Sequence, residues 1–549
     1  MISGLKEPAT KSTSAAAARP LELRKSDSIV SARYILVGFF IIYSCSTLVW
    51  SHRNQMPPPW DPSDHFITAY EYLSLARTSF AAFISDFFFG LHYYPPVFHL
   101  AVASFFWIFG VGSIQSILVN IVALAVLIFS TFKIGSHLFT ERAGCLAAIL
   151  VASYHLPASL LHEGFIDYLM LAEVSLSMWL LLRAGDFKRR SDALILALSL
   201  ALGMLTKETF ALFLVFPIVA VSAKVLINRD RQAIANLFLC GVVALGVLAI
   251  WYAPHFSDVR EIFDVNQQGA IREGEPPAFS LPSFTAYAFI LAREQIQLPL
   301  TILFIAGLIY TLIYKRRESA MLYIWFGGGY LICTLLANKD PRYTLSYLPA
   351  IALLSVALIE VKSTVWKWAL ITIVAAVSLF SFVNAQWPMP GRGFHREGFS
   401  ATLGLNYSIN IFDRNLLNYD HYPIAADWSL GKITKLIADN SKGQQEIHIG
   451  MGINIEYFNP SNLGWFVRMQ DAREHMPKSL VISIFDEGDR DLMVPSCGFL
   501  VTSSKRDGAS FPLVDGLYDE VTIAGRYSYT NIGLFVLPDG MVVGVYKQH

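Results

Sequence analysis

The sequence predicts a polytopic α-helical membrane protein with a small α/β domain at its C-terminal end. Of its 549 residues, 54% are hydrophobic and only 15% are charged, which is too apolar for a soluble protein of this size. Apolar runs of about 20 residues recur up to residue 385, and each is long enough to cross a bilayer as a helix. After Gln386, Gly, Asn and Asp become frequent and the apolar runs shorten.

Charge and cysteine content exclude several other classes. The formal net charge is zero, so nothing indicates a nucleic-acid partner. The five cysteines are scattered and predict neither a disulfide framework nor a cysteine metal site. The sequence has no Walker loop, no dinucleotide glycine fingerprint and no helical His pair with an intervening Glu, which argues against an ATP-driven pump and a zinc protease.

The apolar runs predict about eleven membrane-spanning helices. An additional segment, 95–110, begins at Tyr94-Pro95-Pro96, and we interpret it as juxtamembrane or re-entrant because it is short. The expected spans are 33–51, 113–133, 142–160, 166–184, 193–206, 209–228, 233–253, 297–314, 319–337, 343–361 and 367–385.

Basic residues give the expected orientation. Five short loops are rich in Lys and Arg, and by the positive-inside rule all five are cytoplasmic. This assignment requires one net crossing between 95 and 133, whereas two crossings there would invert the later loops. The loops contain Lys133 and Arg142; Arg183, Lys188, Arg189 and Arg190; Lys224, Arg229 and Arg231; Lys315, Arg316 and Arg317; and Lys362 and Lys367.

We therefore expect three regions. Residues 1–31 are Ser/Ala-rich and basic, and we interpret them as a disordered cytoplasmic tail. Residues 32–386 form the transmembrane domain, with a long first external loop at 52–94. Residues 387–549 form an α/β domain of about 150 residues outside the cytoplasm, with helical spacing at 428–437 and strands at 446–450, 480–484 and 541–546.

Two carboxylates stand just outside the first span. They lie in Trp60-Asp61-Pro62-Ser63-Asp64-His65, where no Lys or Arg separates them. Asp is a common helix N-cap, and a short amphipathic helix over 64–77 would give it that role. A carboxylate beside an apolar wall is equally suited to act as a general base toward a hydroxyl or amine. Both interpretations remain open from the residues alone.

Other ionisable residues occur at the expected outer turns. Glu163 and Asp167 lie together before the 166–184 span, and capping does not explain two acids and a His in one turn. Lys207 forms either an internal ion pair with Glu208 or a phosphate contact. Arg342 either snorkels or clamps a lipid-linked phosphate. The polar stretch 255–282 is expected to be an external loop.

These motifs, in this order, resemble the C-type membrane glycosyltransferases. The shared features are the acidic residue after the first span, the Tyr-Pro-Pro start, the Asp that opens 166–184, the Gly-x-x-Thr-Lys ending at Lys207, and Lys339-Asp340-Pro341-Arg342-Tyr343 before Leu348-Pro349-Ala350. The chain is similar, over about residues 33–360, to bacterial relatives of the dolichyl-phosphate-mannose protein mannosyltransferases and of the aminoarabinose transferases that modify lipid A.

The resemblance implies an integral membrane enzyme that transfers a sugar from a polyprenyl-phosphate donor to an acceptor outside the cytoplasm. It implies Asp64, Asp61 and Asp167 as catalytic candidates, and Lys207, Arg342, Glu163, His65 and Tyr94 as substrate-binding candidates. The family commonly has Asp-Glu where this chain has Asp64-His65, so a divalent metal is left open and no cofactor is firmly implied.

The implied setting is a bacterial inner membrane with the site on the periplasmic side. Tyr94-Pro95-Pro96 replaces the Glu-Lys-Pro of the aminoarabinose transferases, which argues against that specificity. Two other classes stay open: a transporter or flippase of lipid-linked sugars, and a non-catalytic membrane subunit.

Overall fold

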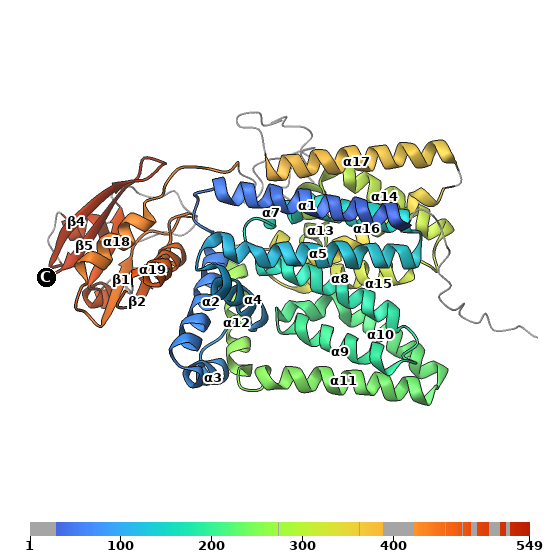
Figure 1. Ribbon diagram of the computed structural model, residues 1–549, viewed down its shortest axis with the longest axis horizontal. Coiled ribbons are helices and arrows are strands. Elements are labelled where there is room, and N and C mark those ends of the chain that lie inside the picture. The colour runs from blue at the N-terminus through green and yellow to red at the C-terminus, as the bar shows by residue number, and fades with distance from the viewer. Residues whose placement is uncertain are drawn as a thin grey trace, which may run out of the picture.

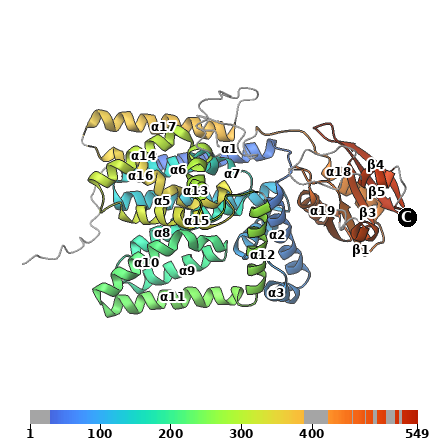
Figure 2. The same ribbon diagram turned by 180° about the vertical axis from the view of Figure 1, so that it is seen from behind.

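The chain forms a helical bundle with an α/β domain attached at one end (Figures 1 and 2). The computed structural model describes residues 29–272, 274–361, 363–387, 422–455, 457–474, 476–484, 491–503, 517–522 and 527–549. Nearly all of the expected tail 1–31, and most of the junction between the two expected domains, lie outside these ranges.

The described part of the bundle consists of helices joined mostly by short turns. Its first half contains α1 (Ile29–Arg53), α2 (Trp60–Thr78), α3 (Phe80–Phe89), α4 (Val97–Phe109), α5 (Ser113–Leu138), α6 (Glu141–Ser153), α7 (His155–Leu160), α8 (Ile166–Ala184), α9 (Arg190–Met204), η1 (Glu208–Phe210), α10 (Ala211–Asn228) and α11 (Arg231–Tyr252). Its second half contains α12 (Phe256–Arg272), α13 (Leu281–Ile290), η2 (Leu291–Gln295), α14 (Gln297–Tyr314), α15 (Ala320–Leu335), η3 (Pro341–Tyr347), α16 (Leu348–Val356), η4 (Ala357–Glu360) and α17 (Thr364–Gln386).

Seven helical stretches within the described residues are long and apolar enough to cross a membrane. Several outer helices expose large apolar side chains, among them Phe238 on α11 and Trp366 on α17, at 73% and 69% exposure. In a bilayer these side chains face lipid, so the exposure does not conflict with stability. The polytopic helical fold class is thus confirmed. The seven stretches are 32–53, 113–138, 208–228, 231–252, 297–314, 341–360 and 364–386.

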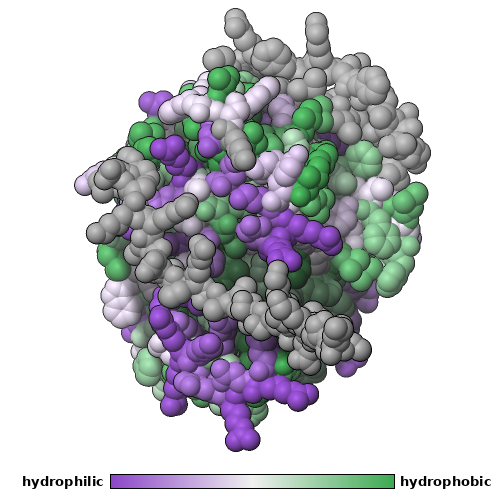
Figure 3. All heavy atoms as spheres, turned by 90° about the vertical axis from the view of Figure 1, so that its right-hand side faces the viewer, coloured by the Kyte–Doolittle hydropathy of each residue, from purple (hydrophilic) through white to green (hydrophobic). Residues whose placement is uncertain are grey.

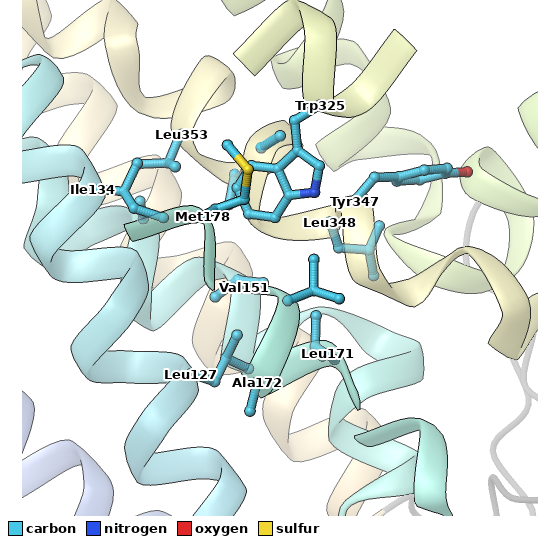
Figure 4. Packing of buried hydrophobic residues seen from close by; sticks show 14 of the residues in the cluster. Leu127, Ile134, Val151, Leu171, Ala172, Met178, Trp325, Tyr347, Leu348 and Leu353 are labelled. Atoms are coloured by element: carbon cyan, nitrogen blue, oxygen red, sulfur yellow. The ribbon is translucent and has the colours of Figure 1, made fainter. Parts of the chain in front are cut away.

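The interior of the bundle is tightly packed around α5, α6, α8 and α16. Figure 4 shows Leu127, Val151 and Leu171 packed beneath Trp325 and Tyr347, which come from distant helices. Helices α5 and α6 approach closely at Gly135 and Gly144, where a Cβ on Gly135 would lie 2.5 Å from the Gly144 Cα. Such small-residue contacts are a common way to pack helices in membranes.

One expected span is interrupted, and another, which falls within the candidate span 341–360, changes its helix type. The 142–160 segment breaks at Tyr154 into α6 and α7, because the Pro157 ring conflicts with the carbonyl of Ser153, where α6 ends. The 343–361 segment starts as the 3₁₀ turn η3 and becomes α-helical at Leu348, with Pro349 in its first turn. By contrast, the 166–184 span coincides with α8.

The segment 255–282, expected as an external loop, is mostly helical. The segment is polar, so its helical spacing was not recognised. Phe256, Val259 and Phe263 are spaced three and four residues apart, which places these apolar residues on one side of α12. α13 follows from Leu281. The short segment 95–110 is the 13-residue helix α4.

The expected cytoplasmic loops gather at one end of the bundle. Thr140 and Lys315 both contact Glu360, which joins three of these loops. Lys224 pairs with Asp186 at 3.3 Å and joins the other two. Figure 3 looks onto this end, where hydrophilic side chains cover much of the visible face. The α/β domain lies at the opposite end (Figure 1).

A five-stranded mixed sheet forms the core of the C-terminal α/β domain. The order is β2-β1-β3-β5-β4, with β1 parallel to β2 and β3, and β5 antiparallel to β3 and β4. The expected strands match β1 (Glu446–Met451), β2 (Lys478–Ser483) and β5 (Val542–Gln548), and the expected helix matches α18 (Leu430–Asn440). The prediction missed α19 (Pro460–Glu474), α21 (Leu517–Thr522), β3 (Phe499–Ser503) and β4 (Tyr529–Val536).

Helix α19 docks the C-terminal domain onto the bundle. The Trp465 ring packs edge-on to Phe66 of α2 at 5.5 Å and stacks on Phe106 of α4 at 5.7 Å. Its indole N–H donates to Ser113 Oγ at 3.1 Å. A fully buried Trp at the contact fixes how the domain sits on α2.

Candidate active site

An arginine from η3 joins a carboxylate of its own turn to a carboxylate of the distant helix α2. Arg342 Nη1 donates to Asp61 Oδ2 at 2.7 Å, and Nη2 donates to Asp340 Oδ2 at 2.6 Å. Its guanidinium lies 4.6 Å from the centre of the Phe165 ring. Asp340 also caps η3 by accepting from the Arg342 backbone N–H, so the carboxylate holds both the turn and the side chain.

A second ion pair joins two further turns. Lys207 Nζ donates to Asp167 Oδ1 at 2.7 Å, and both side chains are buried. Lys207 also lies 5.3 Å from the centre of the Tyr343 ring, next to Arg342 in the chain. The sequence left open a pair between Lys207 and Glu208, but the hydrogen-bonded partner is Asp167. The turn before α8, the turn after α9 and η3 are therefore adjacent.

The two aspartates of α2 differ in their surroundings. Asp61 is half exposed and bonded to Arg342. Desolvation by itself would raise the pKa of Asp61, but the Arg342 guanidinium outweighs it and holds that pKa below its usual range. Asp64 lies one turn further along the helix and hydrogen-bonds to the Ser461 side chain at the start of α19.

The pKa of the Asp64 carboxyl group lies near neutral pH. Solvent reaches the residue, yet protein encloses most of its surroundings. This desolvation raises the pKa of Asp64 to about 7, while the Ser461 hydrogen bond partly opposes the rise and the negative charge of Asp61 adds to it. Two acids whose environments separate their pKa values in this way are a recurrent feature of acid–base sites.

His65 and Tyr94 form an uncharged wall beside these groups. His65 Nδ1 lies 3.0 Å from His99 Nε2, and its ring meets the Tyr94 ring edge at 4.9 Å. Burial lowers the pKa of His65 to about 4, so the imidazole is neutral at pH 7. Burial, with the charges of Asp61 and Asp167 nearby, raises the pKa of Tyr94, so its phenol keeps its proton.

Glu163, another sequence candidate, lies in the turn before α8. Its carboxylate is 3.4 Å from His162 Nε2, and His162 stacks against Trp50 at the end of α1. Gly164 follows with φ of +76°, and a Cβ there would lie 2.6 Å from the Phe66 ring, so this turn packs against α2.

The structure thus brings six of the eight candidates together: Asp61, His65, Tyr94, Asp167, Lys207 and Arg342 act on one another electrostatically. Asp64 lies beside them on α2, and Glu163 lies in the neighbouring turn. Sequence reasoning did not assign a site role to Asp340 or Ser461. The signal for Asp340 was its position in the Lys-Asp-Pro-Arg motif, but nothing in the sequence pointed to Ser461.

The described residues do not form a recognisable metal site. No group of three or more His, Cys, Asp or Glu side chains among them is arranged to hold an ion. The position where the resembled family has a second acid is His65, which hydrogen-bonds to His99 instead.

Comparison with known proteins adds a family match. A family model described as dolichyl-phosphate-mannose-protein mannosyltransferase matches residues 94–256. An uncharacterised protein of Aquifex aeolicus is 25% identical over 220 residues, which is 37% of this chain and 42% of that protein. The match thus spans less than half of that relative's length.

Solved structures share the fold over most of the chain. ArnT from Cupriavidus metallidurans, bound to undecaprenyl phosphate, superposes with a TM-score of 0.59 at 12% identity, covering 94% of this chain and 98% of ArnT. The oligosaccharyltransferase of Archaeoglobus fulgidus, tethered with an acceptor peptide, gives a TM-score of 0.53 at 11% identity, covering 86% of this chain and 69% of that protein.

Proposed function

We propose that this chain is a polyprenyl-phosphate-dependent glycosyltransferase, because residues 94–256 match the model of the dolichyl-phosphate-mannose-protein mannosyltransferase family and the chain shares its fold with ArnT. It moves a hexose or pentose from the lipid phosphate to an acceptor on the far side of the membrane from the basic loops. In a bacterium this is the periplasmic side of the inner membrane, where the C-terminal domain also lies.

Asp64 is the proposed general base. The observation that carries this assignment is the contrast between the two α2 carboxylates: Asp61 is held ionised by Arg342, whereas the pKa of Asp64 is about 7. A base near the working pH removes a proton most effectively during the reaction. Asp167 is paired with Lys207, which suits it to holding that cation and not to taking a proton.

The proposed step is a single displacement. The acceptor hydroxyl or amine gives its proton to Asp64 as its oxygen or nitrogen bonds to the anomeric carbon of the sugar. The bond from that carbon to the phosphate oxygen breaks, and the lipid phosphate leaves with the electron pair. One displacement inverts the configuration at the anomeric carbon, and the sugar phosphate itself provides the leaving group.

Arg342 and Lys207 are the proposed phosphate contacts. Arginine matches two phosphate oxygens with its fork, and lysine provides a compact positive charge. Asp61 accepts a hydrogen bond from Nη1 of Arg342, and its side chain is half exposed. We propose that the donor phosphate takes the place of Asp61 there, while Asp340 keeps the guanidinium in position.

A direct assay tests this function. The full-length protein, reconstituted in lipid vesicles, is incubated with polyprenyl-phosphate sugars and an envelope extract. Mass spectrometry then follows loss of the sugar from the lipid and its gain by an acceptor. Transfer supports the proposal. Movement of intact sugar lipid across the vesicle membrane, without any transfer, would instead identify a flippase.

A further inference from the structure

A polar cavity lies between α2 and α19, beyond the candidate catalytic residues. Its volume is about 470 Å³, which is within the range of small-ligand sites. α2 and the nearby residues Asp86, Leu91 and His92 form one side, and α19 with the start of β2 forms the other. The membrane bundle and the C-terminal domain therefore both line this cavity.

The two helices run side by side in one register. Glu71 pairs with Arg468 at 2.7 Å, and Asp64 pairs with Ser461. In both pairs the α19 residue lies 397 positions after the α2 residue. Between these pairs, a Cβ on Gly464 would lie 3.0 Å from Ile67 Cδ1, so the glycine allows close approach. The contact begins at the proposed base and continues for about two turns along α2.

The cavity begins one turn beyond Asp64. Thr68 lines it and donates to the Asp64 carbonyl oxygen at 3.1 Å, and Glu71 lines it one turn further on. Residues spaced by three and four along a helix share a face, so Asp64, Thr68 and Glu71 form one polar stripe. Asp64 thus lies on the same face of α2 as two residues of the lining, one turn from the cavity.

One buried group in the lining has no partner. Tyr72 is 1% exposed, and its hydroxyl makes no hydrogen bond to any of the described residues. Its ring is fixed against Phe83 and His92 at 5.8 Å and 5.3 Å. A buried hydroxyl without a partner is costly unless a ligand or water completes it.

The charged groups of the lining are already paired. Glu71 pairs with Arg468, Asp86 with His92 at 3.2 Å, and Lys478 with Glu446 at 3.2 Å. Asp471 accepts from the Tyr70 hydroxyl at 2.8 Å. The lining thus offers many donors and acceptors but little net charge, and this combination fits a neutral ligand rich in hydroxyl groups.

We propose that this cavity binds the acceptor, and that the acceptor is a neutral carbohydrate whose reacting hydroxyl extends along α2 to Asp64. The proposal rests on the proposed transferase function and adds the class of acceptor. Sugar hydroxyls donate and accept at once, which suits the hydroxyls of Thr68, Tyr72 and Ser479 beside the paired charges. It also gives the C-terminal domain a role in acceptor binding.

The test uses purified full-length protein in nanodiscs. The probes are methyl glycosides of neutral di- to tetrasaccharides, with short neutral Ser/Thr-rich peptides as the competing class. Tyr72→Phe removes one hydroxyl and keeps the ring, and Ser74→Trp fills part of the cavity. We expect each to weaken saccharide binding by roughly tenfold or more. Tyr168→Phe removes a fully buried hydroxyl in α8 and should leave saccharide binding unchanged.

Undecaprenyl phosphate binding, measured on the same samples, separates two kinds of failure. If undecaprenyl phosphate binds but none of the saccharides does, or if Tyr72→Phe binds saccharide as well as the parent, the carbohydrate site is wrong and the transferase proposal stands. Peptide binding with the same sensitivity to Tyr72→Phe would replace the carbohydrate with a protein acceptor. If the parent protein does not bind undecaprenyl phosphate, the proposed transferase function is wrong.

Discussion

Arg342 donates a 2.7 Å hydrogen bond to Asp61, which lies 281 positions earlier in the chain. The bond connects the first helix after the first span to a turn near the end of the bundle. It separates the roles of the two α2 carboxylates, because Asp61 neutralises a cation while Asp64 faces the C-terminal domain. The proposed chemistry depends on this division.

Replacing the proposed base should stop transfer. Asp64→Asn keeps the shape of the side chain and removes its basicity, so we expect turnover to fall by roughly 100-fold or more. Undecaprenyl phosphate binding should be nearly unchanged. Asp258→Asn in α12 is the matched control and should keep full activity. If Asp64→Asn transfers at the parent rate, Asp61 becomes the candidate base. If the variant with both Asp61 and Asp64 replaced also transfers at the parent rate, this loop has no role in catalysis.

The pH dependence of the transfer rate should follow the protonation of Asp64. A base with a pKa of about 7 is protonated and inactive below that pH, so transfer should rise with pH through about 7. Ser461→Ala removes a hydrogen bond that lowers this pKa, so the rising limb should move to higher pH. The rate on the upper plateau should change little. An unmoved limb in Ser461→Ala would show that Asp64 does not control the profile.

The arginine fork should matter for donor binding. Arg342→Lys keeps the charge but loses the planar fork that holds Asp340 and meets phosphate. We expect undecaprenyl phosphate to bind at least roughly tenfold more weakly, as measured by titration in nanodiscs. Arg316→Lys at the opposite end of the bundle is the control. Equal affinity in the parent and Arg342→Lys would contradict the phosphate role.

Two variants can separate the structural role of Lys207, its ion pair with Asp167, from its proposed role in phosphate binding. Lys207→Met leaves the Asp167 carboxylate buried without its cation, and we expect a loss of about 3–5 kcal/mol in stability. Adding Asp167→Leu should restore much of that stability, because a buried pair can be replaced by apolar residues. Thermal unfolding measures both. Donor binding should stay weak in the stable double variant, and its recovery would make Lys207 purely structural.

Orientation can be tested with fusions. A reporter active only outside the cytoplasm should be silent after Arg190 and active after His549, because the basic loops and the C-terminal domain lie at opposite ends of the bundle. A second fusion after Arg229 should also be silent. Activity after Arg190 would require two crossings between 95 and 133 and would move Asp167 to the cytoplasmic side.

The sequence by itself determined the class of the protein, because hydrophobic run length and the placement of basic residues are local properties. It located α8 and the strands β1, β2 and β5 closely, since their patterns match their burial. It failed where proline or polarity altered a local pattern, as at Tyr154 and along α12. It also selected Asp61, Asp64, Asp167, Lys207 and Arg342, since ionisable groups at membrane edges are conspicuous.

Only the tertiary structure decided which of these groups are partners. Asp61 with Arg342, Asp167 with Lys207, and Asp64 with Ser461 are contacts between segments that lie far apart in the chain. The pKa of a carboxylate depends on the charges and solvent around it, and helix packing sets both. The same is true of the cavity between α2 and α19, which exists only because Trp465 and Gly464 bring two separate regions into contact.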